Sequence, residues 1–160
     1  MNCPSEPLFA TTDRPRELGW ILRPSQQEWD AFVQLLDKMV SENLRSKALT
    51  AAGAPKQNSD GQPLGSLNRL AALMESKGIR PELVGEVMEP FREVRSARSK
   101  PAHALRENID DRTFVHRQVD LIGRVTQSLV QLRWWWQGHP ANRDWQPPDY
   151  LADDAPAYRM

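Results

Sequence analysis

Cysteine is nearly absent from this chain of 160 residues, and its one copy, Cys3, lies in a proline-containing N-terminal segment. A single cysteine forms no intramolecular disulfide and no cysteine-based zinc site, which is typical of a protein from a reducing compartment such as the cytoplasm. Histidine is also scarce, and His103, His116 and His139 show no spacing typical of a zinc-binding motif. The sequence therefore predicts no metal and no cofactor.

Long apolar runs are missing too. No segment approaches the roughly 18 apolar residues of a membrane-spanning helix, and the adjacent tryptophans at 134–136 are too short a run to change that. The first residues lack the charged and apolar regions of a signal peptide, so we expect no contact with a membrane. Gly53, Gly61 and Gly65 match no phosphate-binding loop, and neither a P-loop nor a GxSxG motif is present.

Apolar residues recur at spacings of three and four in four segments, and no segment alternates like a strand. Helices are expected over about 25–48, 66–77, from Pro81 to about residue 98, and 112–136, with a kink or a restart at Pro90. The first begins with a capping box, Ser25 and Glu28. Its expected buried face is Trp29, Phe32, Val33, Leu36, Val40 and Leu44. The expected buried face of the last is Val115, Val119, Ile122, Val125, Leu129, Leu132 and Trp136.

These elements predict an all-α bundle of four or five helices. The bundle would occupy residues 25–138 as one domain, with a mobile loop inserted at 50–64, which is rich in Gly, Pro, Asn and Ser. An irregular arm at 1–24 precedes it, and Leu18, Trp20 and Ile21 would dock that arm. A proline-rich tail at 139–160 follows it.

Positive charge is concentrated in one window of an otherwise neutral chain. Lysine plus arginine equals aspartate plus glutamate, 21 of each, so the total charge provides no general attraction to nucleic acid. Residues 92–106 nevertheless hold five cations and one anion, a net charge of +4. The cations are Arg92, Arg95, Arg98, Lys100 and Arg106, and the same window contains His103.

Arg98 and His103 are the one pair in the sequence suited to chemistry. Arginine presents a permanent fork of donors that matches phosphate oxygens, and histidine exchanges a proton near neutral pH. Pro101 fits the first turn of a helix, so the pair would lie on either side of a helix boundary. The alternative is structural, because arginines at a helix C-terminus stabilise its dipole and a single histidine is often a surface group.

The segment from Val94 to His103, VRSARSKPAH, resembles the signature of HEPN domains (higher eukaryotes and prokaryotes nucleotide-binding). Their hallmark is an arginine followed after four to six residues by a histidine. The Pro-Ala-His form resembles the subset in bacterial defence and toxin–antitoxin proteins, and LGWILRPSQQEWDAF at 18–32 is similar to a pattern in the same proteins. The resemblance implies a HEPN-like helical bundle that forms a homodimer with two motifs facing each other.

The resemblance also implies a function, since active members are metal-independent endoribonucleases. Arg98 would hold the scissile phosphate, and His103 would act as general base or acid. Ser99 occupies a position where the family usually has a longer polar residue. Arg95, Lys100 and Arg106 would guide the RNA backbone. Asn108 and Asp110 would orient His103 or cap a helix. An antitoxin or a larger effector protein would be a further partner.

Two other hypotheses remain open at this point. The chain could be a non-catalytic dimerisation or docking module of a larger assembly, as the long last helix and the tryptophans at 134–136 indicate. It could also be a bundle with no role in nucleic-acid binding, in which Arg95 and Arg98 pair with acids such as Glu93 or Asp110. Toxicity on overexpression, relieved by His103→Ala, would favour the nuclease.

Overall fold

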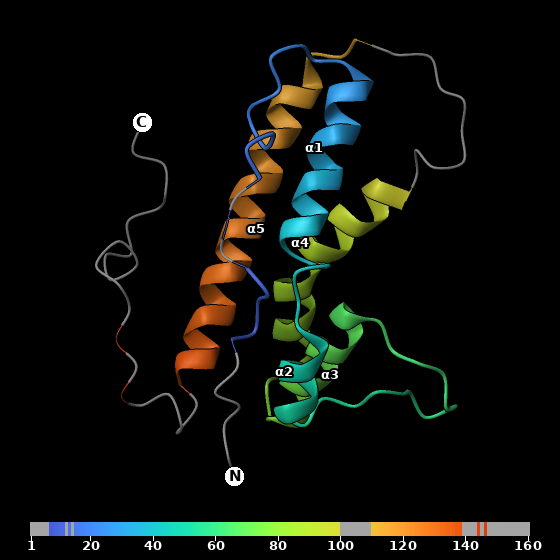
Figure 1. Cartoon of the computed structure of the whole chain (residues 1–160), viewed down its shortest axis with the longest axis vertical. Coiled ribbons are helices and arrows are strands. Elements are labelled where there is room, and N and C mark those ends of the chain that lie inside the picture. Colours follow the sequence, from blue (N-terminus) through green and yellow to red (C-terminus); the bar gives the residue numbers. More distant parts are fainter. Residues whose placement is uncertain are drawn as a thin grey trace.

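The computed structural model describes residues 7–11, 13, 15–99, 110–138, 144 and 146. Within these residues the chain forms five α-helices and no strand (Figure 1). They are α1 (Gln26–Met39), α2 (Ser46–Ala51), α3 (Ser66–Ser76), α4 (Pro81–Ser99) and α5 (Thr113–Gln137). The all-α class is therefore confirmed. None of the helices in this part of the chain is long and apolar enough to cross a membrane.

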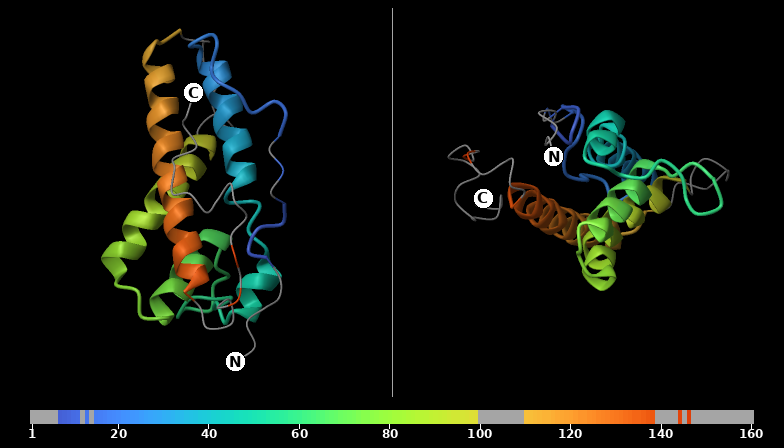
Figure 2. Two further views of the ribbon diagram at one scale, coloured as in Figure 1. Left: turned by 90° about the vertical axis from the view of Figure 1, so that its left-hand side faces the viewer. Right: turned by 90° about the horizontal axis from the view of Figure 1, so that it is seen from below.

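Helix α4 lies at the centre of the bundle and contacts α1, α3 and α5. Figures 1 and 2 show α1 and α5 running lengthwise together, with α2 and α3 forming a lobe at one end. The inward side of α4 is almost wholly apolar and buried: Val84, Val87, Met88, Phe91 and Val94. Pro90 does not restart the helix, because α4 continues through it, and in Figure 1 the two halves of α4 run in different directions.

Helix α1 buries its expected face, and all six residues of the apolar stripe are in the core. Ser25 caps the helix by accepting a hydrogen bond from the backbone N–H of Glu28. The expected single helix over 25–48 is wrong, however, because α1 ends at Met39 and α2 begins at Ser46. The backbone between them pairs with the N-terminal arm instead: Ala10 N–H donates to Asn43 O (2.8 Å), and Arg45 N–H donates to Leu8 O (2.9 Å).

Helix α5 buries only part of its expected face: Val125 and Leu132 are in the core, and Ile122, Leu129 and Trp136 are half-buried against it. Val115 and Val119 are exposed. The buried residues recur at alternating steps of four and three: Phe114, Gln118, Leu121, Val125, Ser128 and Leu132. Two of these six are polar, so a search for apolar residues alone selects the neighbouring positions. Such a pattern of alternating steps is typical of a helix packed lengthwise on its partners.

Gln118 explains why a polar residue occupies this buried face. Its side chain is fully buried and binds the N-terminal arm at two points. Oε1 accepts from Ile21 N–H (2.9 Å), and Nε2 donates to Gly19 O (3.0 Å). Ile21 is buried and Leu18 is half-buried, as expected of the docked arm, whereas Trp20 is exposed.

The lobe at the other end is held together by one buried arginine. The guanidinium of Arg69, on α3, donates to Ser46 Oγ (2.6 Å), Thr50 Oγ1 (2.7 Å) and the Pro55 carbonyl (3.1 Å). These bonds join α2, the following loop and α3. They fix the position of the first turn of α3, which faces the C-terminal end of α4.

Candidate functional site

The C-terminal end of α4 meets the C-terminal end of α1 through a cluster of opposite charges. Arg95 and Arg98 both reach Asp37 on α1, with Nη1 to Oδ2 distances of 2.8 and 2.5 Å. Nη1 of Arg98 also contacts Glu42, in the turn after α1, and Arg95 Nη1 lies 3.9 Å from the same carboxylate. Two arginines of the basic window are thus engaged by two acids that lie more than 50 residues earlier in the sequence.

Asp37 is the fixed point of this cluster, because its side chain is completely buried. Burial acts to raise the pKa of this carboxyl group, but Arg98, the Ser41 hydroxyl and Arg95 together outweigh burial and hold the pKa below its usual 3.8. The group is therefore a carboxylate at neutral pH. A buried carboxylate that accepts from two arginines restricts the directions in which their guanidinium groups point.

Glu42 is the second acid, and it differs from Asp37 in being partly exposed, at 40% for its side chain. The hydrogen bond to Asp37, followed by the one to Glu42, raises the pKa of Arg98 above its usual value. Arg98 is therefore firmly cationic, and it is held by one acid in the core and one acid at the surface.

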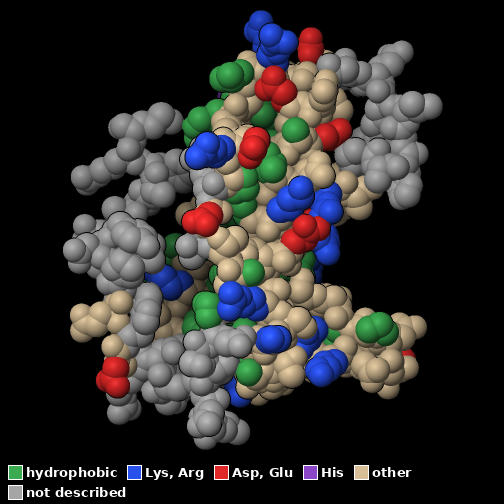
Figure 3. All heavy atoms as spheres, in the orientation of Figure 1, with side chains coloured by type: hydrophobic (Ala, Val, Ile, Leu, Met, Phe, Trp, Pro, Cys, Tyr) green, Lys and Arg blue, Asp and Glu red, His purple; other side chains and the backbone are tan. Residues whose placement is uncertain are grey.

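These arginines border an open cleft of about 680 Å³ between the start of α3 and the last turns of α4. We call it the arginine cleft. One wall is residues 65–68, and the other is Arg92, Arg95, Ser96, Arg98 and Ser99. Figure 3 shows the surface hollowed between α4 and the lobe. The arginines of the cleft all belong to the α4 wall. Among the described residues no acid lines this cleft, since Asp37 and Glu42 reach the arginines from outside it.

The remaining candidate residues divide into three groups. Lys100, His103, Arg106 and Asn108 lie outside the described residues. Ser99 lines the arginine cleft, and its hydroxyl donates to Ser96 O (2.8 Å). Asp110 lies elsewhere, because it pairs with Ser25 at the start of α1.

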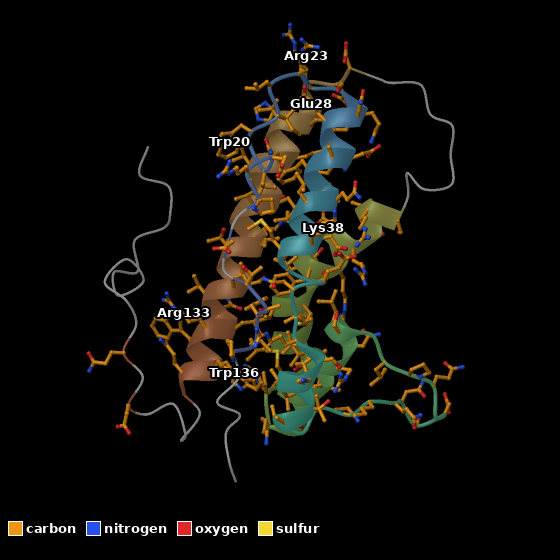
Figure 4. The ribbon with its side chains drawn as sticks, in the orientation of Figure 1. Trp20, Arg23, Glu28, Lys38, Arg133 and Trp136 are labelled. Carbon is orange, nitrogen blue, oxygen red and sulfur yellow. The ribbon has the colours of Figure 1, made fainter. Side chains whose placement is uncertain are left out.

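The separation of Asp110 from the cluster follows from helix geometry. Ser25 and Asp37 are at opposite ends of α1, about 18 Å apart at 1.5 Å per residue. In Figure 4, Arg23 and Glu28 lie at the end of the bundle near Ser25, whereas Lys38, next to Asp37, lies at the other end of α1, near the middle of the molecule. Asp111 lies just before α5, whose N-cap residue is Arg112. Its Oδ1 accepts from Thr113 N–H (2.8 Å), and that bond lowers the pKa of Asp111.

The sequence reasoning missed Asp37 and Glu42, and it named the wrong acids as partners for the arginines. Glu93 instead pairs with Arg124 (2.6 Å). A signal for Asp37 was present, because it follows the buried Val33 by four residues and precedes the buried Val40 by three. A buried acid within the apolar stripe of a helix needs a cationic partner, and the basic window contains several cations.

Among the described residues, no group of three or more His, Cys, Asp and Glu side chains is arranged to hold a metal ion. At the described end of α4, guanidinium groups line the arginine cleft and can bind anions. Comparison of the chain with models of protein families, with curated proteins and with solved structures finds no match.

Proposed function

We propose that this protein is a metal-independent endoribonuclease of the HEPN type, acting in bacterial defence or a toxin–antitoxin system. The observation that carries the proposal is the position of Arg98, which a buried carboxylate orients at the edge of an open cleft lined by arginines. The sequence places His103 five residues later. The all-α architecture is compatible with the family that the motif resembles.

In this mechanism Arg98 binds a non-bridging oxygen of the scissile phosphate. His103 removes the proton of the adjacent 2′-hydroxyl, and the 2′-oxygen attacks phosphorus. The bond from phosphorus to the 5′-oxygen breaks, and that oxygen takes a proton from water as it leaves. The products are a 2′,3′-cyclic phosphate and a free 5′-hydroxyl. Arg98 stabilises the additional negative charge on phosphorus oxygens in the transition state.

The proposed partners follow from the same hypothesis. A second copy of the chain would bring two motifs together, and RNA would be the substrate. An antitoxin or a larger effector protein would control the activity, and the protein would act in the cytoplasm. Arg95, Lys100 and Arg106 would contact RNA phosphates, whereas Asn108 would orient the His103 side chain.

A second candidate is a non-catalytic interaction module, and two observations favour it. Arg95 and Arg98 are both already paired with acids, as in a purely structural cluster. Helix α5 also exposes several large apolar side chains: Val115, Val119, Val130 and Trp134. In this case the basic window would stabilise the bundle, and the outer face of α5 would contact a partner protein.

The deciding experiment is cleavage of labelled total RNA in EDTA by the wild type, Arg98→Ala and His103→Ala. Matched controls are Arg80→Ala, an exposed arginine just before the other end of α4, and His116→Ala, an exposed histidine on α5. We expect cleavage by the wild type and both controls and none by the two motif variants, with the mass in solution showing a dimer. Absence of cleavage by a folded wild-type dimer would instead support the interaction module.

Growth of bacteria that overexpress the protein provides an independent test. The nuclease hypothesis predicts growth arrest by the wild type and by His116→Ala, and normal growth with His103→Ala at equal expression. Equal toxicity of the His103→Ala variant would contradict a catalytic role for this histidine.

A further inference from the structure

The arginine cleft contains more hydrogen-bond donors than Arg98 alone would use to bind the scissile phosphate. Only Nη1 of Arg95 and Nη1 of Arg98 are engaged by acids. Their Nε and Nη2 groups form no hydrogen bond with a described residue. Arg92, exposed on the same wall, forms no ion pair within the described part of the chain.

The described residues around the cleft carry more positive than negative charge, which favours the binding of an anion. Three guanidinium groups are opposed by two carboxylates, and neither carboxylate lines the cleft. The opposite wall adds no compensating acid, because the first turn of α3 contains none. An anion that entered the cleft would therefore meet cations on one side without repulsion from the other.

The size of the cleft suits part of a polynucleotide. Its volume of about 680 Å³ lies within the range of about 300–1,000 Å³ that holds small ligands. Arg92 and Arg95 are three residues apart and hence on neighbouring positions of one helix face. A single guanidinium group can bind phosphate oxygens through two parallel N–H bonds.

We propose that the arginine cleft binds a backbone phosphate of the RNA strand next to the one that is cleaved, with Arg92 as its principal contact. This inference rests on the proposed function for the identity of the strand. Arg92 and Arg95 then position the RNA, and Arg98 acts at the reacting phosphate. The strand would pass between the end of α4 and the start of α3.

The test is the binding of a labelled single-stranded RNA of about 12 nucleotides, carrying 2′-O-methyl groups so that it is not cleaved, measured by fluorescence anisotropy in EDTA. We expect Arg92→Ala to raise Kd by about fivefold at low salt and to reduce the slope of log K against log salt by about 1. The matched control, Arg80→Ala, should leave Kd and slope unchanged. The salt slope separates a phosphate contact from a loss of folding.

A second variant blocks the cleft without removing an arginine. Asn68 is at the third position of α3, where glutamate is favourable for a helix, so Asn68→Glu should fold normally. Its carboxylate would pair with Arg92 and weaken RNA binding at least as much as Arg92→Ala does. A Kd and salt slope equal to those of the wild type in both variants would overturn the inference.

The outcomes for the cleft and for catalysis are separable. If cleavage depends on Arg98 and His103 but RNA binding does not depend on Arg92, the proposed phosphate contact in the cleft is wrong and the nuclease proposal stands. If RNA binding depends on Arg92 but the wild type cleaves no RNA, the RNA-binding role of the cleft is supported and the nuclease proposal is wrong. Displacement of the RNA by a micromolar mononucleotide would identify a free nucleotide as the ligand and overturn the RNA assignment. Absence of RNA binding would overturn both proposals.

Discussion

Arg98 on α4 and Asp37 on α1 form an ion pair with an Nη1 to Oδ2 distance of 2.5 Å, and Asp37 has no solvent exposure. The pair joins the two helices at the end where α4 borders the arginine cleft. A buried carboxylate of this kind serves two purposes at once. It attaches α4 to α1, and it limits the orientations available to the guanidinium group that we propose contacts phosphate.

Replacing Asp37 with asparagine should destabilise the protein strongly. Asn keeps the volume but removes the charge on which two arginines depend, and breaking a buried pair costs about 3 kcal/mol or somewhat less where the partners are partly exposed. The free energy of unfolding from urea titration is the measurement. Asp120→Asn is the control, because Asp120 pairs with Arg124 at the surface, and its removal should cost less than about 1 kcal/mol. Equal effects of the two substitutions would show that the buried pair contributes little.

The same carboxylate should make stability depend on acid. The pKa of Asp37 is lower in the folded protein than in the unfolded chain, because Arg98, Ser41 and Arg95 outweigh the effect of burial. Its contribution is therefore complete above the unfolded pKa of about 3.9 and disappears as pH falls through the folded pKa. We expect the unfolding free energy of the wild type to fall below about pH 5. Asp37→Asn should fall less over that interval, and parallel curves would contradict the assignment.

The apolar pattern was sufficient for the helices and insufficient for the polar contacts that align them. It located α1, α3, α4 and α5, because each has apolar residues at spacings of three and four. For α5 it predicted the buried Val125 and Leu132 but also the exposed Val115 and Val119. It missed Gln118 and Ser128, because a hydrophobic pattern skips buried polar residues. It joined α2 to α1, because the pairing of Asn43 and Arg45 with the distant arm leaves no local signal.

In the candidate site, too, the sequence predicted some residues and not others. Arg98 and Arg95 could be selected because cations cluster in the sequence, and their charge is visible without a fold. Their partners could not be selected, because Asp37 and Glu42 lie on another helix and the turn after it, and only packing brings them to α4. Asp110 is near the motif in sequence but pairs with Ser25, at the opposite end of α1.

Gln118→Leu should release the N-terminal arm. The substitution removes the acceptor for Ile21 N–H and the donor to Gly19 O, leaving two backbone groups without partners at a cost of about 1–3 kcal/mol. We expect trypsin to cut after Arg16, which precedes Glu17, faster than in the wild type. Gln127→Leu, at an exposed position of α5, is the control. Unchanged cleavage rates would indicate that Leu8 and Ile21 hold the arm without Gln118.

Glu42→Gln should strengthen RNA binding if Arg98 contacts phosphate. Glu42 is partly exposed and shares Nη1 of Arg98 with Asp37, so its carboxylate competes with a phosphate oxygen for the same donor. The neutral amide removes that competition, while Asp37 continues to orient the arginine. Because an exposed ion pair contributes at most about 1 kcal/mol, stability should change little. We expect RNA affinity at low salt to rise several-fold and the salt slope to become steeper.

The matched control for this variant is Glu82→Gln, which also removes one negative charge but at the exposed start of α4. It should change affinity only slightly, because it is about 24 Å along the helix from Arg98. If both variants raise affinity equally, the effect comes from total charge and Arg98 is not its target. If Glu42→Gln weakens binding, Glu42 is needed to orient Arg98 and is not a competitor of the phosphate.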